Sequence, residues 1–178
     1  MDRPLYPFTA VVGQERAKQA LLCLAVEPRI GGVLLCGEKG TAKSTLVRAL
    51  GGLDGVRLLE LPVSATEDML LGGVELEAAV RTGRRTFQPG LLARADGAVL
   101  YADDLLPSAL TAALLDTLET GVCRVERDGI SHTCPARFAL VGTMNPEEGT
   151  LRPQLLDRFG LYVAVTGERE PEARKEVV

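Results

Sequence analysis

The stretch Val33-Leu-Leu-Cys-Gly-Glu-Lys-Gly-Thr-Ala-Lys-Ser44 decides the fold. Its first four residues are apolar and stand between glycines, which predicts a short buried strand. A helix is expected directly afterwards, over Lys43 to Leu50. A strand, a glycine-bearing loop and a helix in this order indicate a phosphate-binding loop. In such a loop backbone N–H groups surround the phosphates, Lys43 reaches the β- and γ-phosphates, and the Ser44 hydroxyl binds Mg²⁺. The candidate phosphate-binding residues are Gly37, Glu38, Lys39, Gly40, Thr41, Ala42, Lys43, Ser44 and Thr45.

Ala42 departs from the motif, because G-x-x-x-x-G-K-[ST] has a glycine at this position. Alanine adds one methyl group and suits helical backbone. The loop can therefore keep its shape if Ala42 has the right-handed helical conformation. Taken alone, the relaxed pattern does not distinguish a phosphate site from an ordinary glycine-rich turn.

Polar residues at the ends of two further predicted strands favour the phosphate site. The apolar run Ala98-Val-Leu-Tyr-Ala102 ends in Asp103 and Asp104. An acid at a strand tip beside the loop can hold the Mg²⁺ that bridges the β- and γ-phosphates, a role assigned to Asp103. Asp104 could then orient and deprotonate an attacking water. Asn145 follows the strand expected from Arg137 to Gly142, and at the same sheet edge it would position that water.

Strand and helix signals alternate along the chain, which predicts an α/β fold with a parallel sheet flanked by helices. Two stretches, Val74 to Phe87 and Val122 to Cys134, break the alternation and are interpreted as hairpin insertions. Besides the elements given above, we expect helices over Gly13–Glu27 and Ser108–Leu118, a short helix from Pro153 to near Gly160, and strands over Val56–Leu61 and Leu161–Val165.

Length and composition limit the class of protein. The 178 residues are 46% hydrophobic, enough for one domain over residues 1–178. A formal net charge of −4 argues against a protein that coats nucleic acid or an anionic membrane. The longest apolar run, Ala20 to Val26, is far shorter than the roughly 20 residues of a spanning helix. We expect a cytoplasmic domain without membrane or nucleic-acid partners.

The cysteines are too few for a disulfide scaffold. Cys23 and Cys36 are predicted core residues. If Asp128-Gly129 is a two-residue turn, Cys123 faces Cys134, and His132 shares their face of the hairpin. Three such ligands could bind a metal. The missing fourth ligand and a reducing compartment favour a hairpin without metal.

Several blocks of the sequence together resemble the AAA+ ATPase subunit of magnesium chelatase and its chelatase-like relatives, including the fused I–D type. The resemblance implies an AAA+ P-loop NTPase core whose hexameric ring hydrolyses ATP with Mg²⁺. The ring would help chelatase partner subunits to insert Mg²⁺ or Co²⁺ into a tetrapyrrole. The matching blocks are Tyr6-Pro-Phe-Thr-Ala-Val-Val-Gly-Gln-Glu15, the loop quoted above, Leu100-Tyr-Ala-Asp-Asp104, Val125-Glu-Arg-Asp-Gly-Ile-Ser131 and Asn145-Pro-Glu-Glu-Gly-Thr-Leu-Arg-Pro-Gln-Leu-Leu-Asp-Arg-Phe-Gly160.

The resemblance also implies roles for single residues. Asn145 matches sensor 1, and the two insertions match the helix-2 hairpin and the pre-sensor-1 hairpin. Arg158 matches the arginine finger that reaches a neighbouring subunit's nucleotide; the alternative is a local Asp157–Arg158 ion pair. The helical lid with its sensor-2 arginine would follow Val178. Asp103 matches Walker B, and Val12, Gly13 and Gln14 match the segment that covers the adenine.

Two departures from the family pattern leave alternatives open. The family commonly has glycine at position 42 and glutamate at position 104. Since Asp104 is one methylene shorter, its carboxylate falls back by about 1.5 Å, and such a misplacement can lower a rate ~10²-fold. The chain could therefore be an ATP-sensing scaffold subunit with little hydrolysis. A MoxR-like ATPase that remodels metalloproteins is the other alternative.

Overall fold

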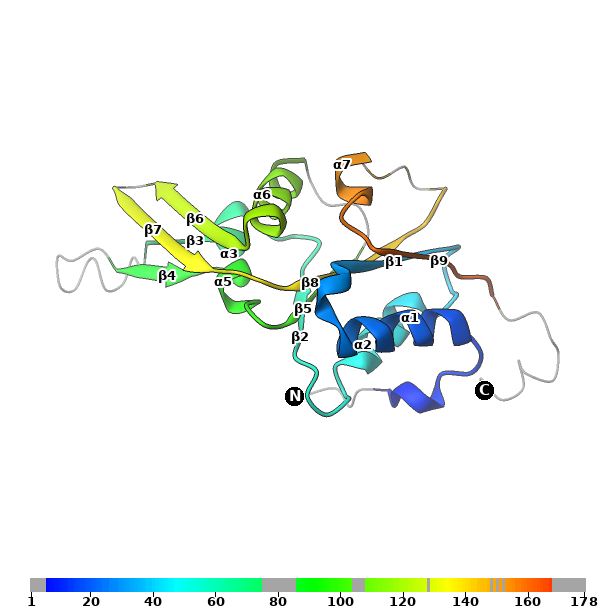
Figure 1. Cartoon of the computed structure of the whole chain (residues 1–178). Coiled ribbons are helices and arrows are strands. Elements are labelled where there is room, and N and C mark those ends of the chain that lie inside the picture. Colours follow the sequence, from blue (N-terminus) through cyan, green and yellow to red (C-terminus); the bar gives the residue numbers. More distant parts are fainter. Residues whose placement is uncertain are drawn as a thin grey trace.

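A computed structural model describes residues 6–74, 86–103, 108–127, 129–147, 149, 151 and 153–167 of the chain (Figure 1). Within these residues the main sheet has five strands in the order β2-β5-β8-β1-β9, and every neighbouring pair is parallel. The predicted parallel α/β fold is confirmed. The strands are β1 (Gly32–Cys36), β2 (Leu58–Leu61), β5 (Val99–Asp103), β8 (Ala139–Met144) and β9 (Leu161–Ala164).

Side chains of the sheet alternate between two hydrophobic cores, as the two-residue period of a strand requires. Val99 and Tyr101 of β5 face one core, whereas Leu100 and Ala102 face the other. Each residue of β1 is buried, which explains its continuous apolar run. The core thus occupies both faces of the sheet and leaves its strand ends for polar side chains.

Helices cover both faces (Figure 1). The first face packs against η1 (Phe8–Ala10), α1 (Glu15–Val26) and α2 (Lys43–Leu50), which begins and ends where the sequence predicts. The turn η2 (Pro28–Ile30) follows α1. The second face packs against α3 (Glu67–Leu71), α5 (Leu91–Arg94), α6 (Ser108–Thr120) and α7 (Pro153–Leu156).

Two strands begin later than expected because local hydrogen bonds hold the residues before them. The N–H of Val56 donates to the Leu53 carbonyl, so this residue belongs to a turn, and β2 begins at Leu58. The N–H of Arg137 donates to the Asp96 carboxylate, and its carbonyl accepts from Gly97. These bonds replace ladder bonds, so β8 begins at Ala139.

Both breaks in the alternation contain antiparallel strands. The strands β3 (Gly72–Val74) and β4 (Phe87–Pro89) pair at the base of the first insertion, and residues 75–85 between them lie outside the described residues. The strands β6 (Val122–Arg127) and β7 (Ile130–Pro135) form the second. Their register pairs Cys123 with Cys134 and Val125 with His132, which confirms the predicted pairing. The rings of Phe87 and His132 stack with centroids 4.1 Å apart and so join the two hairpins.

The cysteines are free thiols. Burial raises the pKa of the Cys123 thiol to about 11, which makes it unreactive. Across the described residues, no group of three His, Cys, Asp or Glu side chains could hold a metal ion. The prediction that Cys23 is a core residue is wrong: Leu21 and Leu24 turn α1 toward the sheet, which leaves Cys23 exposed.

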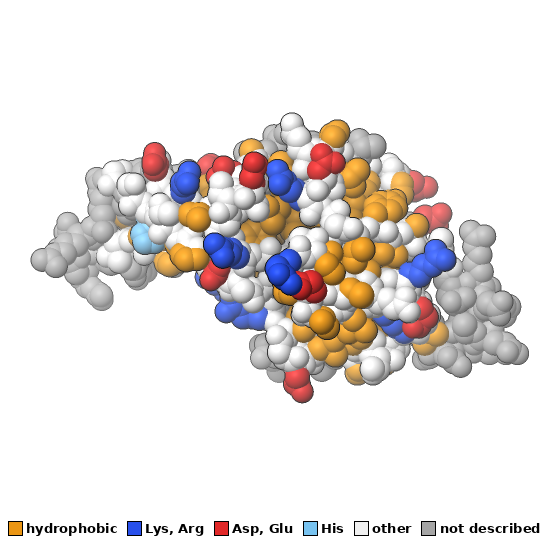
Figure 2. All heavy atoms as spheres, in the orientation of Figure 1, with side chains coloured by type: hydrophobic (Ala, Val, Ile, Leu, Met, Phe, Trp, Pro, Cys, Tyr) orange, Lys and Arg blue, Asp and Glu red, His pale blue; other side chains and the backbone are white. Residues whose placement is uncertain are grey.

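The surface carries mixed charge. Figure 2 shows basic and acidic side chains interspersed over one face, with hydrophobic side chains gathered over α1 and α2. Leu22 and Val26 of α1 are exposed. In the part of the chain that the structure describes, every helix is too short or too polar to cross a bilayer.

Candidate functional site

Three neighbouring parallel strands bring the phosphate-binding loop, Asp103 and Asn145 to one edge of the sheet. β1 runs into the loop before α2, β5 ends at Asp103, and β8 leads into Asn145. The Gly37 N–H donates to the Met144 carbonyl at 3.0 Å and ties the loop to the end of β8. A cavity of about 300 Å³ opens at this edge, lined by Lys39, Gly40, Thr41, Ala42, Lys43, Ser44, Thr45, Asp103 and Asn145.

The loop closes around the ammonium group of Lys43. This Nζ donates to the carbonyl oxygens of Gly37 at 2.8 Å and Glu38 at 2.7 Å, and lies 3.3 Å from the Thr41 hydroxyl. Gly37 is required here because a Cβ atom would lie 2.0 Å from the carbonyl oxygen of Val165. A buried cation is thereby held in the wall of the cavity, where it can attract an anion.

Ala42 has the left-handed conformation, with φ 60° and ψ 19°, so the condition under which alanine would suit the loop, a right-handed conformation, is not met. The residue is the N-cap of α2, and the loop must reverse direction there before the helix begins. Glycine adopts this conformation freely, whereas an L-residue in it costs about 1–2 kcal/mol. The methyl group is exposed, so the cost arises from the backbone alone.

Asp103 receives hydrogen bonds from two hydroxyl groups. Its Oδ1 accepts from the Ser44 Oγ at 3.2 Å and from the Thr143 Oγ1 at 2.5 Å. The Thr143 hydroxyl donates its proton to Asp103, so it can only accept from a second hydroxyl. The buried Tyr101 hydroxyl, whose oxygen lies 3.3 Å from the Thr143 Oγ1, is therefore the donor to Thr143. Burial raises the pKa of Tyr101 and keeps this donor protonated. Sequence reasoning missed Thr143, although a hydroxyl two residues before Asn145 in an apolar strand was a usable signal.

Asn145 is buried at the cavity, and its Oδ1 accepts from the Glu147 N–H at 3.2 Å. This bond fixes the amide where it borders the loop and Asp103. Asp104, the predicted catalytic acid, lies outside the described residues.

The predicted adenine-covering segment lies against the end of β9. Gly13 and Gln14 have positive φ angles of 67° and 58°. The Gln14 amide donates to the Thr166 carbonyl at 2.7 Å, and the preceding residue, Val165, borders Gly37. Val12 precedes these two residues and is half-buried. The segment is therefore connected to the phosphate-binding loop through the chain that leaves β9.

Arg158 stands apart from the other predicted residues. It follows α7 and is absent from the residues that line the cavity. Its Nη2 lies 3.1 Å from the Glu119 Oε2 at the end of α6, so its ion-pair partner is Glu119 and not the neighbouring Asp157. The Arg158 side chain is 40% exposed and can reach another molecule.

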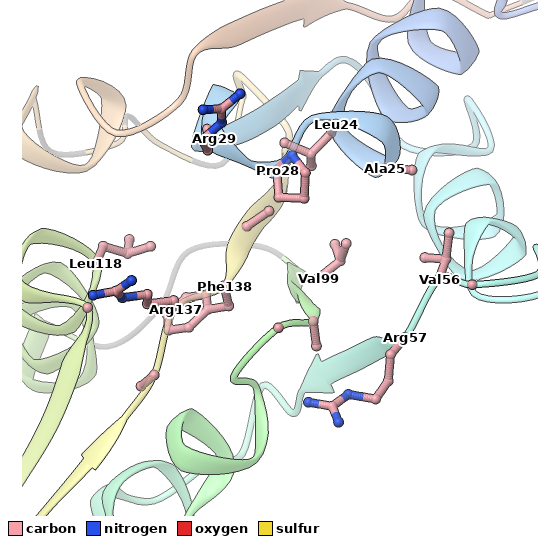
Figure 3. Close-up of a pocket in the computed structure, with 16 residues that line it drawn as sticks. Leu24, Ala25, Pro28, Arg29, Val56, Arg57, Val99, Leu118, Arg137 and Phe138 are labelled. Carbon is pink, nitrogen blue, oxygen red and sulfur yellow. The ribbon is translucent and has the colours of Figure 1, made fainter.

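A second cavity, of about 340 Å³, lies at the opposite edge of the sheet (Figure 3). It is lined by apolar side chains such as Leu24, Val56 and Phe138, together with Arg29, Arg57 and Arg137. Glu27 binds Arg29 through both carboxylate oxygens, and two backbone carbonyls accept from Arg57. This cavity contains none of the side chains for which the sequence predicts chemistry.

The chain is similar to several known proteins. The family model "AAA domain (dynein-related subfamily)" matches residues 32–159. The chain is 54% identical to the uncharacterized protein Rv2850c of Mycobacterium tuberculosis, over 97% of this chain and 29% of that protein. It is 42% identical to magnesium-chelatase subunit ChlI of Pyropia yezoensis, over 99% of this chain and 61% of that subunit. It is 45% identical to the magnesium-chelatase 38 kDa subunit of Rhodobacter capsulatus, over 99% of this chain and 60% of that subunit.

A solved structure is also similar. It describes the complex between subunits BchI and BchD of magnesium chelatase and superposes with a TM-score of 0.77 at 44% identity. The match covers 98% of this chain and 65% of that one. This chain thus spans less than two thirds of the relatives named here.

Replacing Ala42 with glycine tests the strain in the loop. Glycine removes the strain of the left-handed conformation, which stabilises the fold by about 1–2 kcal/mol. It also raises the conformational entropy of the unfolded chain, which costs about 0.4–1 kcal/mol of stability. We expect the free energy of unfolding in urea to rise by about 0.5–1 kcal/mol. Ala49→Gly, inside α2 and without such strain, should lower it. A loss of stability in both variants would contradict the strain at Ala42.

Proposed function

Because the chain belongs to the AAA domain family, in the dynein-related subfamily, we propose that it is the ATP-hydrolysing motor core of a magnesium-chelatase complex. The observation that carries the proposal is the hydrogen bond from Ser44 to Asp103. It joins the phosphate-binding loop to the acid at the end of β5, beside a buried lysine. A hydroxyl, a carboxylate and a cation at one sheet edge are the groups that Mg²⁺ and a nucleoside triphosphate require.

In this proposal each part of the cavity has a role. Backbone N–H groups of the loop and the N-terminus of α2 bind the phosphates, and Lys43 faces the β- and γ-phosphates. The oxygens of Ser44 and Asp103 suit Mg²⁺, which when bound neutralises charge on the β- and γ-phosphates. Asp104 deprotonates the attacking water and Asn145 orients it. Val12, Gly13 and Gln14 cover the adenine, and residues 1–178 form the nucleotide-binding core domain.

The same proposal gives the chain its partners. The BchI and BchD subunits of the similar structure form a complex, which supports assembly with chelatase partner subunits. We propose a homo-oligomeric ring of six copies whose ATP hydrolysis drives insertion of a metal ion into a tetrapyrrole by those partners. In the ring, the exposed Arg158 would bind the γ-phosphate of the neighbouring copy, where such fingers raise rates by ~10³–10⁵.

A second candidate function follows from one residue. Asp104 stands where glutamate is common, and a displaced base would slow hydrolysis. The chain would then bind ATP and hold the complex together with little turnover.

Lys43→Ala tests nucleotide binding. Loss of the cation facing the phosphates should weaken ATP binding more than tenfold, or about 1.4 kcal/mol, as measured by calorimetry. Lys18→Ala is the matched control, because Lys18 pairs with Glu15 on α1. The Lys18→Ala protein should bind ATP as tightly as the unmodified protein. Equal ATP affinity in all three proteins would refute the phosphate-binding loop.

Substitutions of Asp104 separate the motor from the scaffold. If Asp104 is a working base, Asp104→Asn should abolish single-turnover hydrolysis of Mg·ATP, and Asp104→Glu should raise it by up to ~10²-fold. The exposed Asp54→Asn should change nothing. Rates near background in both Asp104 variants and in the unmodified protein would instead support the scaffold.

Mixed rings test whether Arg158 acts on a neighbour. Arg158→Ala and Lys43→Ala, each in a form that carries the lid, should be inactive alone. Their mixture should regain ATPase activity, because intact Lys43 sites meet intact Arg158 side chains from the other variant. The control mixes Arg158→Ala with the double variant Arg158→Ala/Lys43→Ala. This mixture contains no intact Arg158 and should stay inactive. If proteins shown to co-assemble gave no recovery, Arg158 would not act between subunits.

A further inference from the structure

We propose that Arg48 is a positioning residue for the Asp103 carboxylate and that Glu60 holds Arg48 in place; this inference rests on the proposed function. Arg48 follows Ser44 by four residues on α2, so both side chains lie on one face of the helix. The Ser44 Oγ lies 3.2 Å from the Asp103 Oδ1, and the Arg48 Nη2 lies 3.6 Å from the Oδ2. One helix face thus contacts both oxygens of the carboxylate.

The two oxygens of Asp103 have different partners. Oδ1 accepts from the hydroxyls of Ser44 and Thr143, whereas Oδ2 faces the guanidinium of Arg48. A partial rotation of the carboxylate would break both hydrogen bonds from the hydroxyl groups. A full half-turn would only exchange two equivalent oxygens. The side chain is only 23% exposed, so water competes weakly for these contacts. The carboxylate is therefore presented to Ser44, the other candidate magnesium ligand, in a single orientation.

Glu60 on β2 fixes the guanidinium itself. The Arg48 Nε lies 3.1 Å from one Glu60 oxygen and the Nη2 lies 2.5 Å from the other, a two-point contact that sets the plane of the guanidinium. The hydrogen bonds to Glu60 raise the pKa of Arg48. The Arg48 Cζ lies 5.8 Å from the centre of the Tyr101 ring. Glu60 and Tyr101 are register partners on adjacent strands, so the sheet itself defines where Arg48 lies.

The chain offers a matched comparison in Arg29 and Glu27. Their contact has the same two-point geometry, at 2.8 Å and 2.5 Å, but Arg29 is 89% exposed and lies at the rim of the second cavity (Figure 3). Exposed ion pairs of this kind contribute little to stability. What distinguishes Arg48 is its Nη2, which faces Glu60 and Asp103 together.

The test measures how much Mg²⁺ strengthens nucleotide binding. Calorimetry gives the Kd of a β,γ-imido analogue of ATP in Mg²⁺ and in EDTA. The ratio of the Kd in EDTA to the Kd in Mg²⁺ measures how much the metal strengthens binding. Residues that orient metal ligands typically change metal affinity 10–100-fold. Arg48→Met should therefore lower the ratio at least tenfold, close to the effect of Asp103→Asn. Glu60→Gln should lower the ratio less than Arg48→Met does. Arg48→Lys, which keeps the positive charge, should give a ratio between those of Arg48→Met and the unmodified protein. Arg29→Met should leave it unchanged.

A double variant decides whether Arg48 acts through Asp103. Arg48→Met combined with Asp103→Asn should lose no more than Asp103→Asn alone, because the orienting residue then has nothing to orient. Additive losses, or a normal ratio in Arg48→Met beside a lowered one in Asp103→Asn, would overturn the positioning role. If Arg48→Met fails to fold, as thermal unfolding would show, Glu60→Gln and Arg48→Lys decide the question in the same way. Absence of binding by the unmodified protein would instead overturn the proposed function.

Discussion

The parallel pairing of β8 with both β1 and β5 is the constraint on which the site depends. In a parallel sheet the carboxyl ends of neighbouring strands meet at one edge, and here the register aligns Cys36 with Met144 and Asp103 with Thr143. Groups that lie far apart in sequence thus come within hydrogen-bond distance without any long loop to guide them. The apolar residues of β1, β5 and β8 fix this register, because a slip by one residue would exchange the side chains that pack into the two cores.

Features that depend on short stretches of sequence could be predicted. The bounds of α2, the strand that ends at Asp103 and the pairing of Cys123 with Cys134 each follow from local spacing of apolar and turn residues. The missed features depend on residues brought together by the fold. Local sequence marks Thr143 only as a hydroxyl in an apolar strand, and it does not show the contact of Thr143 with Asp103 or the pairing of Arg158 with Glu119. The left-handed conformation of Ala42 could not be predicted, because alanine's preference for helix yields to the geometry of the loop.

Stability and chemistry are separated in this fold. The two cores contain the large apolar side chains, and the described polar groups of the site stand where the strands end. The candidate site nevertheless carries a local cost, since Ala42 of the loop and Gln14 before α1 both have left-handed backbone. Gln14 is held there by the Thr166 carbonyl, whereas Ala42 is held by the helix that follows it. Rigid surroundings therefore maintain two conformations that short peptides would seldom adopt.

The stacked rings of Phe87 and His132 have a mechanical consequence. The hairpin β3–β4 continues directly from α3, and the hairpin β6–β7 follows α6 after a single residue. Both helices pack on the sheet face that Leu100 and Ala102 of β5 share. The ring contact joins β3–β4 to β6–β7 away from the sheet, in addition to the packing of α3 and α6 against that face. A displacement of either strand pair is therefore passed to the other through these rings, and through α3 and α6 to the sheet face that Leu100 shares.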